Sequence, residues 1–344
     1  MPVFPTALPA PRTPDAMAAP PLRWGVIGPG WIAERFIGSL RRHTRQEVSA
    51  VASRDLDRST AFASKHRVER PYGSYKELLA DPAIDVVYIA TPHNAHYPCA
   101  QMSLRAGKHT LVEKPIALNA AQAGVLAGLA AEHDVFFMEA LWTMFLPKFD
   151  VIRQLLEDGV LGEIRTVIAD HGEYFTNDHR IMRHDLAGGP LLDLGTYPIS
   201  FVQWILGEPA TVQAAGQPHP AGVNGQASAI VTDAGGNQGV INTTLFSTTP
   251  TTGVIAGTGG TLTIPGPYYQ PGPMTLTSAT GEVLAYDEPA IGHDALFYEA
   301  AEVARCISAG LRESPLRTLA DSVATMRVVD EIRRQIGVVF NEER

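Results

Sequence analysis

The stretch Gly28-Pro29-Gly30-Trp31-Ile32-Ala33 fits the pattern G-x-G-x-x-G/A, in which x is any residue. The apolar run Leu22–Ile27 precedes it and predicts a buried strand, and the residues that follow through Leu40 predict a helix. In such a strand–turn–helix unit, glycine permits the tight turn and lets the backbone approach a pyrophosphate, while the helix N-terminus offers N–H groups to the phosphates. The stretch therefore predicts a dinucleotide-binding fold, and a purely structural glycine turn is the alternative. The residues expected at the cofactor here are Gly28, Gly30, Trp31 and Ile32.

Apolar strands alternate with helices over the rest of residues 21–142. Because this alternation is typical of a doubly wound parallel sheet, we expect an α/β Rossmann domain over 21–142. The further strands are expected at Val48–Ser53, Val86–Ala90, Thr110–Val112 and Val135–Glu139, and the further helices at Ser59–His66, Ser74–Leu79, Ala95–Ala106 and Ala120–Glu132.

The pattern changes after about Trp142. A helix is expected over Phe149–Leu156, and Ile164–Tyr286 is rich in Thr, Val, Gly and Pro, with one helical stretch at Leu191–Leu206. Helical patterning returns from Asp294 to Ile336. Residues 143–344 therefore predict an α+β domain with a large, mainly antiparallel open sheet, which would bind substrate and form oligomers. Residues 1–20, rich in Pro and Ala, are expected to form a disordered tail.

Composition excludes several classes of protein. The chain has 344 residues and a formal net charge of −9, which argues against nucleic acid or an anionic membrane as a partner. The sequence contains no run of about 18 apolar residues that would predict a membrane span. The first 20 residues lack the apolar core of a secretion signal. Two cysteines far apart form neither a disulfide framework nor a zinc site, so we expect a reducing compartment and a cytoplasmic protein. No metal is expected, because no cluster of His, Asp and Glu has the spacing of metal ligands; a metal at His93 and His96 is the disfavoured alternative to contacts with the cofactor.

The residues after the second strand discriminate between NAD and NADP. Enzymes that use NAD commonly have Asp or Glu here to bind the ribose 2′-hydroxyl, whereas this chain has Ser53-Arg54. A hydroxyl and a planar guanidinium suit a 2′-phosphate, and Arg58 is one helical turn further on, so we expect NADP in preference to NAD. Asp55 would serve the ribose if the turn is offset, and a solvated surface arginine is the alternative for Arg54.

Glu113-Lys114-Pro115 follows a strand of the predicted parallel sheet. Ligands of such sheets bind outside the carboxyl ends of the strands, so Lys114 is expected at the reactive end of the cofactor. An ammonium group there can bond a substrate hydroxyl or carbonyl and pass on its proton. A lysine that only pairs with Glu113 is an equally weighted alternative.

Asp193 and Tyr197 are spaced i, i+4 and share one face if Leu192 onward is helical. An acid and a phenol on one face can orient a hydroxyl and exchange its proton. By spacing alone, the favoured alternative is that Asp193 caps a helix and Tyr197 packs in the core.

Taken together, the motifs resemble those of the Gfo/Idh/MocA family of oxidoreductases over nearly all of residues 22–344. Glu-Lys-Pro is the most diagnostic tripeptide of that family, and its Lys-Pro bond is often cis in family members. The matching pieces are Gly-Pro-Gly-Trp-Ile-Ala (28–33), Ala-Ser-Arg (52–54), Thr-Pro-His-Asn-Ala-His (91–96), Gly-Lys-His-Thr-Leu-Val-Glu-Lys-Pro (107–115), Glu-Ala-Leu-Trp-Thr-Met-Phe-Leu-Pro (139–147), Gly-Gly-Pro-Leu-Leu-Asp-Leu-Gly-Thr-Tyr-Pro-Ile (188–199) and Gly-Leu-Arg-Glu-Ser-Pro (310–315).

Within the family, the chain is most similar to the branch of dihydrodiol dehydrogenases and NADP-dependent D-xylose dehydrogenases. The resemblance implies catalytic roles for Lys114, Tyr197 and Asp193, with Arg180 as a further substrate residue. Members of the branch often have Arg where this chain has Met144, which suggests a less polar ligand. The residues implied at the cofactor, besides the glycine turn, are Ser53, Arg54, Arg58, Thr91, Pro92, His93, Asn94, His96, Glu113, Lys114 and Trp142.

These observations predict an enzyme that transfers a hydride between a nicotinamide cofactor and a hydroxyl or carbonyl of a sugar, polyol or dihydrodiol, with Lys114 and Tyr197 exchanging the proton. Loops at 172–187 and 264–274, the second with Tyr268 and Tyr269, are expected to shape the pocket. The resemblance also implies a homodimer or homotetramer formed through the second sheet. The alternatives are aldose–aldose transfer with a tightly bound cofactor, as in glucose–fructose oxidoreductase, and a non-catalytic dinucleotide-sensing regulator.

Overall fold

A computed structural model of the chain describes residues 4–343. Contacts between Cα atoms divide it into two compact units, which are described separately. The parallel-sheet unit contains residues 14–145 and 291–323. The antiparallel-sheet unit contains, among the described residues, 4–13, 146–290 and 324–343.

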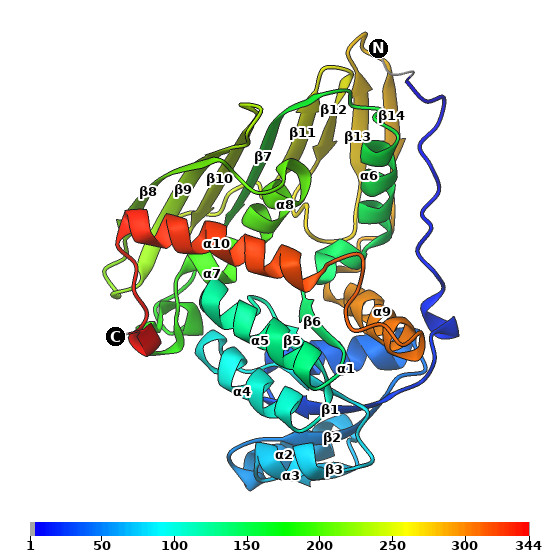
Figure 1. The fold of residues 1–344 in the computed structure, drawn as a ribbon, viewed down its shortest axis with the longest axis vertical. Coiled ribbons are helices and arrows are strands. Elements are labelled where there is room, and N and C mark those ends of the chain that lie inside the picture. Colours follow the sequence, from blue (N-terminus) through cyan, green and yellow to red (C-terminus); the bar gives the residue numbers. More distant parts are fainter. Residues whose placement is uncertain (1–3, 344) are drawn as a thin grey trace. The chain divides into compact units, whose positions relative to one another are not determined.

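The parallel-sheet unit is built on six strands in the order β3-β2-β1-β4-β5-β6, all parallel to their neighbours (Figure 1). This is the doubly wound order, and it confirms the expected Rossmann fold. All four residues of β4 are buried, as expected of a parallel strand covered on both faces. The strands are β1 (Arg23–Ile27), β2 (Glu47–Ala52), β3 (Arg70–Tyr72), β4 (Val86–Ile89), β5 (His109–Glu113) and β6 (Phe137–Ala140). Strand β3 is absent from the sequence prediction because Pro71 argues against a strand, although proline is tolerated at a sheet edge such as this one.

Helices connect these strands, and α4 and α5 lie side by side (Figure 1). Their bounds are α1 (Trp31–His43), α2 (Leu56–His66), α3 (Tyr75–Ala80), α4 (His93–Arg105), α5 (Ala120–Glu132) and the short 3-10 helix η2 (Trp142–Phe145). Two later elements, η5 (Gly292–Leu296) and α9 (Phe297–Ser308), pack against α1. Residues 291–323 therefore group with the parallel sheet, whereas the sequence suggested that they are part of a second domain formed by residues 143–344. The apolar face of α9, which is buried from Phe297 to Cys306, is the physical reason.

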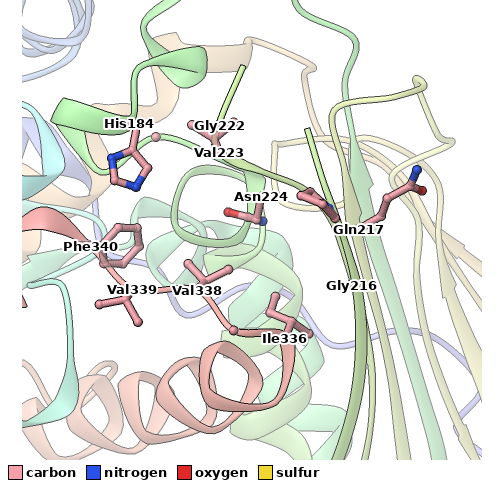
Figure 2. A pocket seen from close by; sticks show the side chains of 13 residues that line it. His184, Gly216, Gln217, Gly222, Val223, Asn224, Ile336, Val338, Val339 and Phe340 are labelled. Atoms are coloured by element: carbon pink, nitrogen blue, oxygen red, sulfur yellow. The ribbon is translucent and has the colours of Figure 1, made fainter. Parts of the chain in front are cut away.

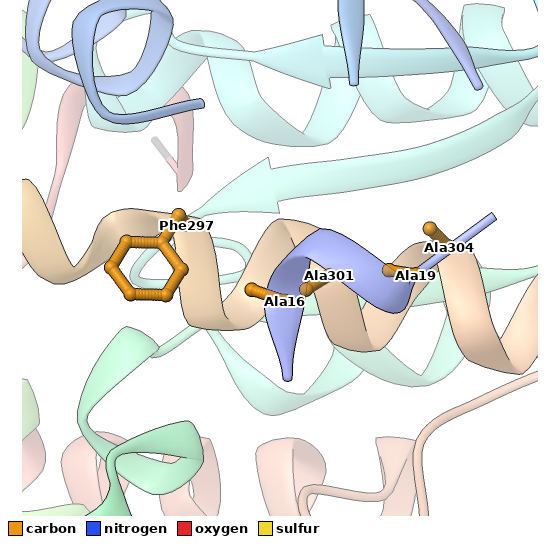
Figure 3. Packing of buried hydrophobic residues seen from close by; sticks show 5 residues of the cluster. All are labelled: Ala16, Ala19, Phe297, Ala301 and Ala304. Carbon is orange, nitrogen blue, oxygen red and sulfur yellow. The ribbon is translucent and has the colours of Figure 1, made fainter. Parts of the chain in front are cut away.

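The segment before β1 differs from the disordered tail that the sequence suggested. A 3-10 helix, η1 (Ala16–Ala18), lies on α9, and Figure 3 shows Ala16 and Ala19 beside Phe297, Ala301 and Ala304. Small side chains on both partners allow this close approach. Upstream, Arg12 forms an ion pair with Asp150 at 3.0 Å. Residues 1–3 of the predicted tail lie outside the described residues.

The antiparallel-sheet unit is built on eight strands in the order β14-β13-β12-β11-β7-β10-β9-β8. Strands β7 and β10 are parallel and every other neighbouring pair is antiparallel, which confirms the expected mainly antiparallel sheet. The strands are β7 (Ile164–Gly172), β8 (Thr211–Pro218), β9 (Asn224–Thr232), β10 (Gln238–Thr244), β11 (Gly253–Gly257), β12 (Gly260–Ile264), β13 (Met274–Ser278) and β14 (Val283–Tyr286).

Helix α8 packs on β7 and β10 of this sheet. The expected single helix over Leu191–Leu206 is in fact two helices, because the chain departs from α-helical hydrogen bonding at Leu194-Gly195. The helices are α6 (Pro147–Glu157), α7 (Pro190–Asp193), α8 (Thr196–Leu206) and α10 (Leu319–Ile336), with 3-10 helices η3 (Arg180–Met182), η4 (His184–Leu186) and η6 (Asn341–Glu343). The division between the units falls within α10. In the described part of the chain, none of the helices combines the length and the apolar character needed to cross a bilayer.

Candidate active site

The glycine turn after β1 lies at the point where the strand order of the parallel sheet reverses. Gly28 has a φ of +95°, and a Cβ added there would lie 2.8 Å from the carbonyl oxygen of Ala90, just after β4. Gly30 is the N-cap of α1 and borders open space, since a Cβ added there would have no neighbouring atom within 4 Å. The backbone N–H groups of the first turn of α1 thus have no side-chain cap and can receive a phosphate. This turn fits the pyrophosphate of a dinucleotide.

The residues after β2 include two arginines and an acid that caps the next helix. The carboxylate of Asp55 caps α2 and accepts the backbone N–H groups of Asp57 at 2.9 Å and Arg58 at 3.3 Å. This carboxylate is therefore already engaged by the chain. Arg54 is exposed, and the Arg58 guanidinium donates to the carbonyl of Pro29 at 3.1 Å, which ties α2 to the glycine turn. A basic side chain is thus available where the sequence predicts the adenosine end of the cofactor.

Three aromatic rings, those of Trp31, His293 and Trp142, form a chain of contacts beside the glycine turn. Trp31 remains 57% exposed and contacts the ring of His293 edge-on at 5.0 Å between centroids. Trp142, which is buried, stacks on the same imidazole at 5.4 Å. Sequence reasoning placed both tryptophans near the cofactor but missed His293, because nothing in its local sequence indicates that η5 packs against α1.

Lys114 lies at the carboxyl end of β5, where the sequence predicts it, and its bond to Pro115 is cis. The backbone N–H of Lys114 donates to Glu113 at 3.2 Å, and Tyr88 donates its hydroxyl to the same carboxylate. The next residue but one, Ile116, donates its N–H to the buried Glu139 at 3.0 Å. The backbone on both sides of Lys114 is therefore held by buried carboxylates.

His96 fixes this loop from a second direction. Its two ring nitrogens lie 2.7 Å from the carbonyl oxygen of Pro115 and 2.8 Å from that of Thr91. His96 therefore links the segment after β4 to the segment after β5, and both nitrogens are engaged by backbone oxygen. The ring of His93 is 5.7 Å away, but the described residues include no cluster of three or more His, Cys, Asp or Glu side chains arranged for a metal.

A buried acid that sequence reasoning missed lies near Glu113. Glu299 on α9 is fully buried, and neither of its carboxyl oxygens has a hydrogen-bond partner within residues 4–343. Burial first, and then the charge of Glu113, raise the pKa of Glu299 well above its ordinary value. Folding therefore favours the protonated, neutral form of this carboxyl group.

Glu299→Gln is expected to flatten the dependence of stability on pH. A carboxyl group whose pKa is raised by folding binds more protons in the folded than in the unfolded chain, so the free energy of unfolding falls as pH rises above about 4.3. Glutamine keeps the shape and removes the titration. Urea unfolding at pH 5, 6.5 and 8 should show that the free energy of unfolding falls less with rising pH in the variant than in the wild type. Glu132→Gln, at an exposed position of α5, should decline like the wild type, and equal declines for all three proteins would contradict the assignment.

In the antiparallel-sheet unit, Asp193 and Tyr197 lie in one cluster although they belong to different helices. Arg180 pairs with Asp193 at 2.9 Å, and half of the Arg180 side chain is exposed. Tyr197 stacks on Tyr269 at 4.2 Å between centroids. Burial, together with the charges of Glu173 and Asp193, raises the pKa of Tyr269 to about 12. Tyr269 therefore lies near Asp193 as well as against Tyr197.

The two tyrosines of the 264–274 loop have different surroundings. Tyr268 is fully buried and packs on Phe201 at 5.1 Å between ring centroids, so it belongs to the core and not to a pocket. Only Tyr269 joins the cluster around Tyr197. Met144 is also buried, so an apolar side chain fills the position at which the family resemblance leads one to expect arginine.

A cavity of about 560 Å³ lies elsewhere in the antiparallel-sheet unit. Figure 2 shows His184, Asn224 and Phe340 around it, with the chain that follows α10 forming one wall. Its lining includes none of the residues that the sequence predicts to be catalytic or cofactor-binding.

Comparison with known proteins supports the same class of fold and chemistry. Residues 22–141 match an oxidoreductase family with an NAD-binding Rossmann fold, and residues 149–263 match the Gfo/Idh/MocA C-terminal domain. The trans-1,2-dihydrobenzene-1,2-diol dehydrogenases of Bos taurus and Sus scrofa are 36% and 37% identical to the chain, over 94% of its length and 99% of theirs.

Solved structures are similar as well. A 3-ketoreductase from Actinomadura kijaniata, determined with NADP and TDP-benzene, has a TM-score of 0.81 and 27% identity, over 92% of this chain and 98% of that one. A levoglucosan dehydrogenase, determined with NADH and levoglucosan, has a TM-score of 0.84 over 92% of this chain and 97% of its own. At 19% identity, this second likeness shows the fold alone.

Proposed function

The chain belongs to the Gfo/Idh/MocA family of NAD-binding oxidoreductases, and from this premise we propose that it transfers a hydride between NADP and a hydroxyl or carbonyl of a sugar, polyol or dihydrodiol. The observation that supports this most is the position of Lys114 at the carboxyl end of β5, next to the strand β4 that borders the glycine turn. Ligands of doubly wound sheets bind at that end.

When bound, the nicotinamide cofactor supplies a two-electron hydride acceptor or donor. The proposed work of the chain is to position the reacting hydroxyl and move its proton. Lys114 bonds the substrate oxygen through its amine and takes the proton on oxidation or gives it on reduction. Tyr197 is the second donor and acceptor, and Asp193, held by Arg180, orients the hydroxyl group.

We infer that the substrate is a ring with neighbouring hydroxyl groups. The Arg180–Asp193 pair offers a donor and an acceptor to adjacent hydroxyls, while the stacked rings of Tyr197 and Tyr269 offer a flat apolar surface. The buried Met144 favours a less charged ligand. The relatives named dihydrodiol dehydrogenases are consistent with this class.

A panel of aldoses, inositols and dihydrodiols, each with free NADP and with free NAD, tests the proposed function by the absorbance of the reduced nicotinamide. Turnover of at least one ring diol with free NADP is expected. Absence of turnover over the whole panel would contradict it. A cofactor that copurifies and does not exchange would instead favour aldose–aldose transfer.

Arg54→Ala is expected to reduce selectivity for NADP. A charge-assisted hydrogen bond to a phosphate contributes about 1.5–3 kcal/mol, and the lower value suits an exposed side chain, so KM for NADP should rise about tenfold. KM for NAD should change less than about twofold, because NAD carries no 2′-phosphate. Arg45→Ala, at an exposed position before β2, is the matched control and should leave both values unchanged. Equal effects on the two cofactors would contradict the assignment.

The outer face of the second sheet is the proposed interface of a homodimer or homotetramer. Val240 on β10 pairs directly with Ile168 on β7 and with Ile230 on β9, and all three side chains are exposed. A row of exposed apolar side chains across three strands is more typical of an interface than of a solvated face. A sedimentation measurement that finds only monomer would contradict this.

The proposed cellular location is the cytoplasm. Cys99 and Cys306 are both free and buried, and burial raises the pKa of the Cys99 thiol to about 11 and that of Cys306 to about 12. Unreactive, unpaired thiols fit a reducing compartment.

A further inference from the structure

The cluster around Tyr197 contains a histidine that the proposed chemistry does not use. His171 lies near the end of β7 and is 2% exposed. Its ring stacks on Tyr269 at 4.7 Å between centroids and lies 5.7 Å from the ring of Tyr197. Because Tyr197 and Tyr269 also stack on each other, the three rings form a closed triangle, here called the three-ring cluster.

One nitrogen of this imidazole has a partner and the other does not. The Nε2 atom of His171 lies 3.0 Å from a carboxylate oxygen of Glu173, whose side chain is 44% exposed. The Nδ1 atom is buried and has no partner in the described part of the chain. Because a carboxylate only accepts hydrogen bonds, Nε2 carries a proton, and the charge of the ring depends on whether Nδ1 carries one as well.

The charged and titratable groups around His171 come from several elements. Helix α8, which packs on β7, contributes Tyr197, and the loop before β13 contributes Tyr269. The neighbouring strand β10 places the uncharged Thr243 opposite His171. The remaining charged groups of the cluster are Glu173, Asp193 and its partner Arg180, together with His179, on which Arg180, Asp193 and Glu173 all act.

We propose that His171, held by Glu173, is a positioning residue that controls the proton of Tyr197 through its own charge. A cation beside a phenol favours the phenolate, so the imidazolium form of His171 increases the fraction of Tyr197 in the form that accepts a proton. The neutral form lacks this effect. No proton passes between the two rings, because His171 acts on Tyr197 only through the charge of its ring. The inference rests on the proposed function, because it concerns the proton step of that reaction.

The test compares two variants with a control over the dependence of kcat/KM on pH. The wild type should show an inflection between about pH 5 and 8, where imidazoles titrate. His171→Phe keeps an aromatic ring in the cluster and should abolish this inflection. Glu173→Gln removes the carboxylate and should move the inflection to lower pH, because a neighbouring negative charge favours an imidazolium. Glu163→Gln, at an exposed glutamate just before β7, should match the wild type.

A titration of the His171 ring proton by NMR, without substrate or cofactor and assigned with His171→Phe, is the second readout. Glu173→Gln should move this titration in the same direction and by the same amount. A rate that falls equally at all pH values in His171→Phe, or an NMR shift without a matching kinetic shift, would overturn the inference and leave the proposed function intact. Absence of wild-type turnover would overturn the proposed function and this inference with it.

Discussion

Lys114→Ala is expected to lower kcat by about 10²–10⁴-fold, the usual contribution of a positioned acid–base group. The loop that holds Lys114 is fixed by backbone bonds to Glu113 and Glu139, so removal of the side chain should leave the fold unchanged. Steady-state kinetics on whichever substrate the panel identifies measure the loss. Cofactor binding by fluorescence titration should change less than about threefold, because the proposed role of the amine is in the proton step.

The matched control is Lys65→Ala. Lys65 pairs with Glu34 at the surface, and both side chains are largely exposed. Because surface ion pairs contribute little, this variant should retain the activity and stability of the wild type. Activity of Lys114→Ala near the wild-type level on every substrate found would remove the proposed catalytic role of the lysine.

Arg317→Met is expected to lower the free energy of unfolding by about 3–5 kcal/mol. Arg317 and Glu139 form a buried ion pair at 2.8 Å, with side chains 1% and 0% exposed. Glu139 also accepts the hydroxyl of Ser322 at 2.7 Å and the backbone N–H of Ile116. Loss of the guanidinium leaves a buried carboxylate without its counter-charge, and methionine cannot replace the two hydrogen bonds that Arg317 donates to Glu139. Urea unfolding followed by circular dichroism measures the effect.

Two further variants separate charge burial from loss of packing. Arg334→Met breaks an ion pair with Glu331 in which the arginine is 71% exposed, so it should change stability by less than about 1 kcal/mol. Adding Glu139→Gln to Arg317→Met removes the uncompensated charge and should recover part of the loss. A loss below about 1 kcal/mol for Arg317→Met, or no recovery in the double variant, would show that the pair is not isolated from water.

Much of the parallel-sheet unit was predictable because its signals are local. The glycine turn, the strand before it and the helix after it all lie where the pattern of residues 22–40 predicts them. Helix α5 has the predicted bounds, Ala120–Glu132. Errors arose where a local pattern was incomplete: Pro71 concealed an edge strand, and Leu194-Gly195 divided a helix that apolar periodicity treated as one.

The candidate site was predictable only in part. Lys114, Asp193 and Tyr197 were proposed because each belongs to a short motif, and their catalytic roles stay predictions. His171, His293 and Glu299 were missed because their neighbours in sequence say nothing about their surroundings. Each becomes informative only when the fold brings a distant partner to it: Tyr197 and Tyr269 to His171, the two tryptophans to His293, and Glu113 to Glu299.

By itself, the sequence determined the class of the protein: a dinucleotide turn, a parallel sheet, a second mainly antiparallel sheet, and a lysine at a strand end. These follow from hydrophobic periodicity and turn chemistry, which depend on residues a few positions apart. Only the tertiary structure decided which charges are buried and which rings touch, as with Glu139 and Arg317 or the three-ring cluster. Burial and long-range contact are properties of the packed chain, because each requires that water be excluded by segments far apart in sequence.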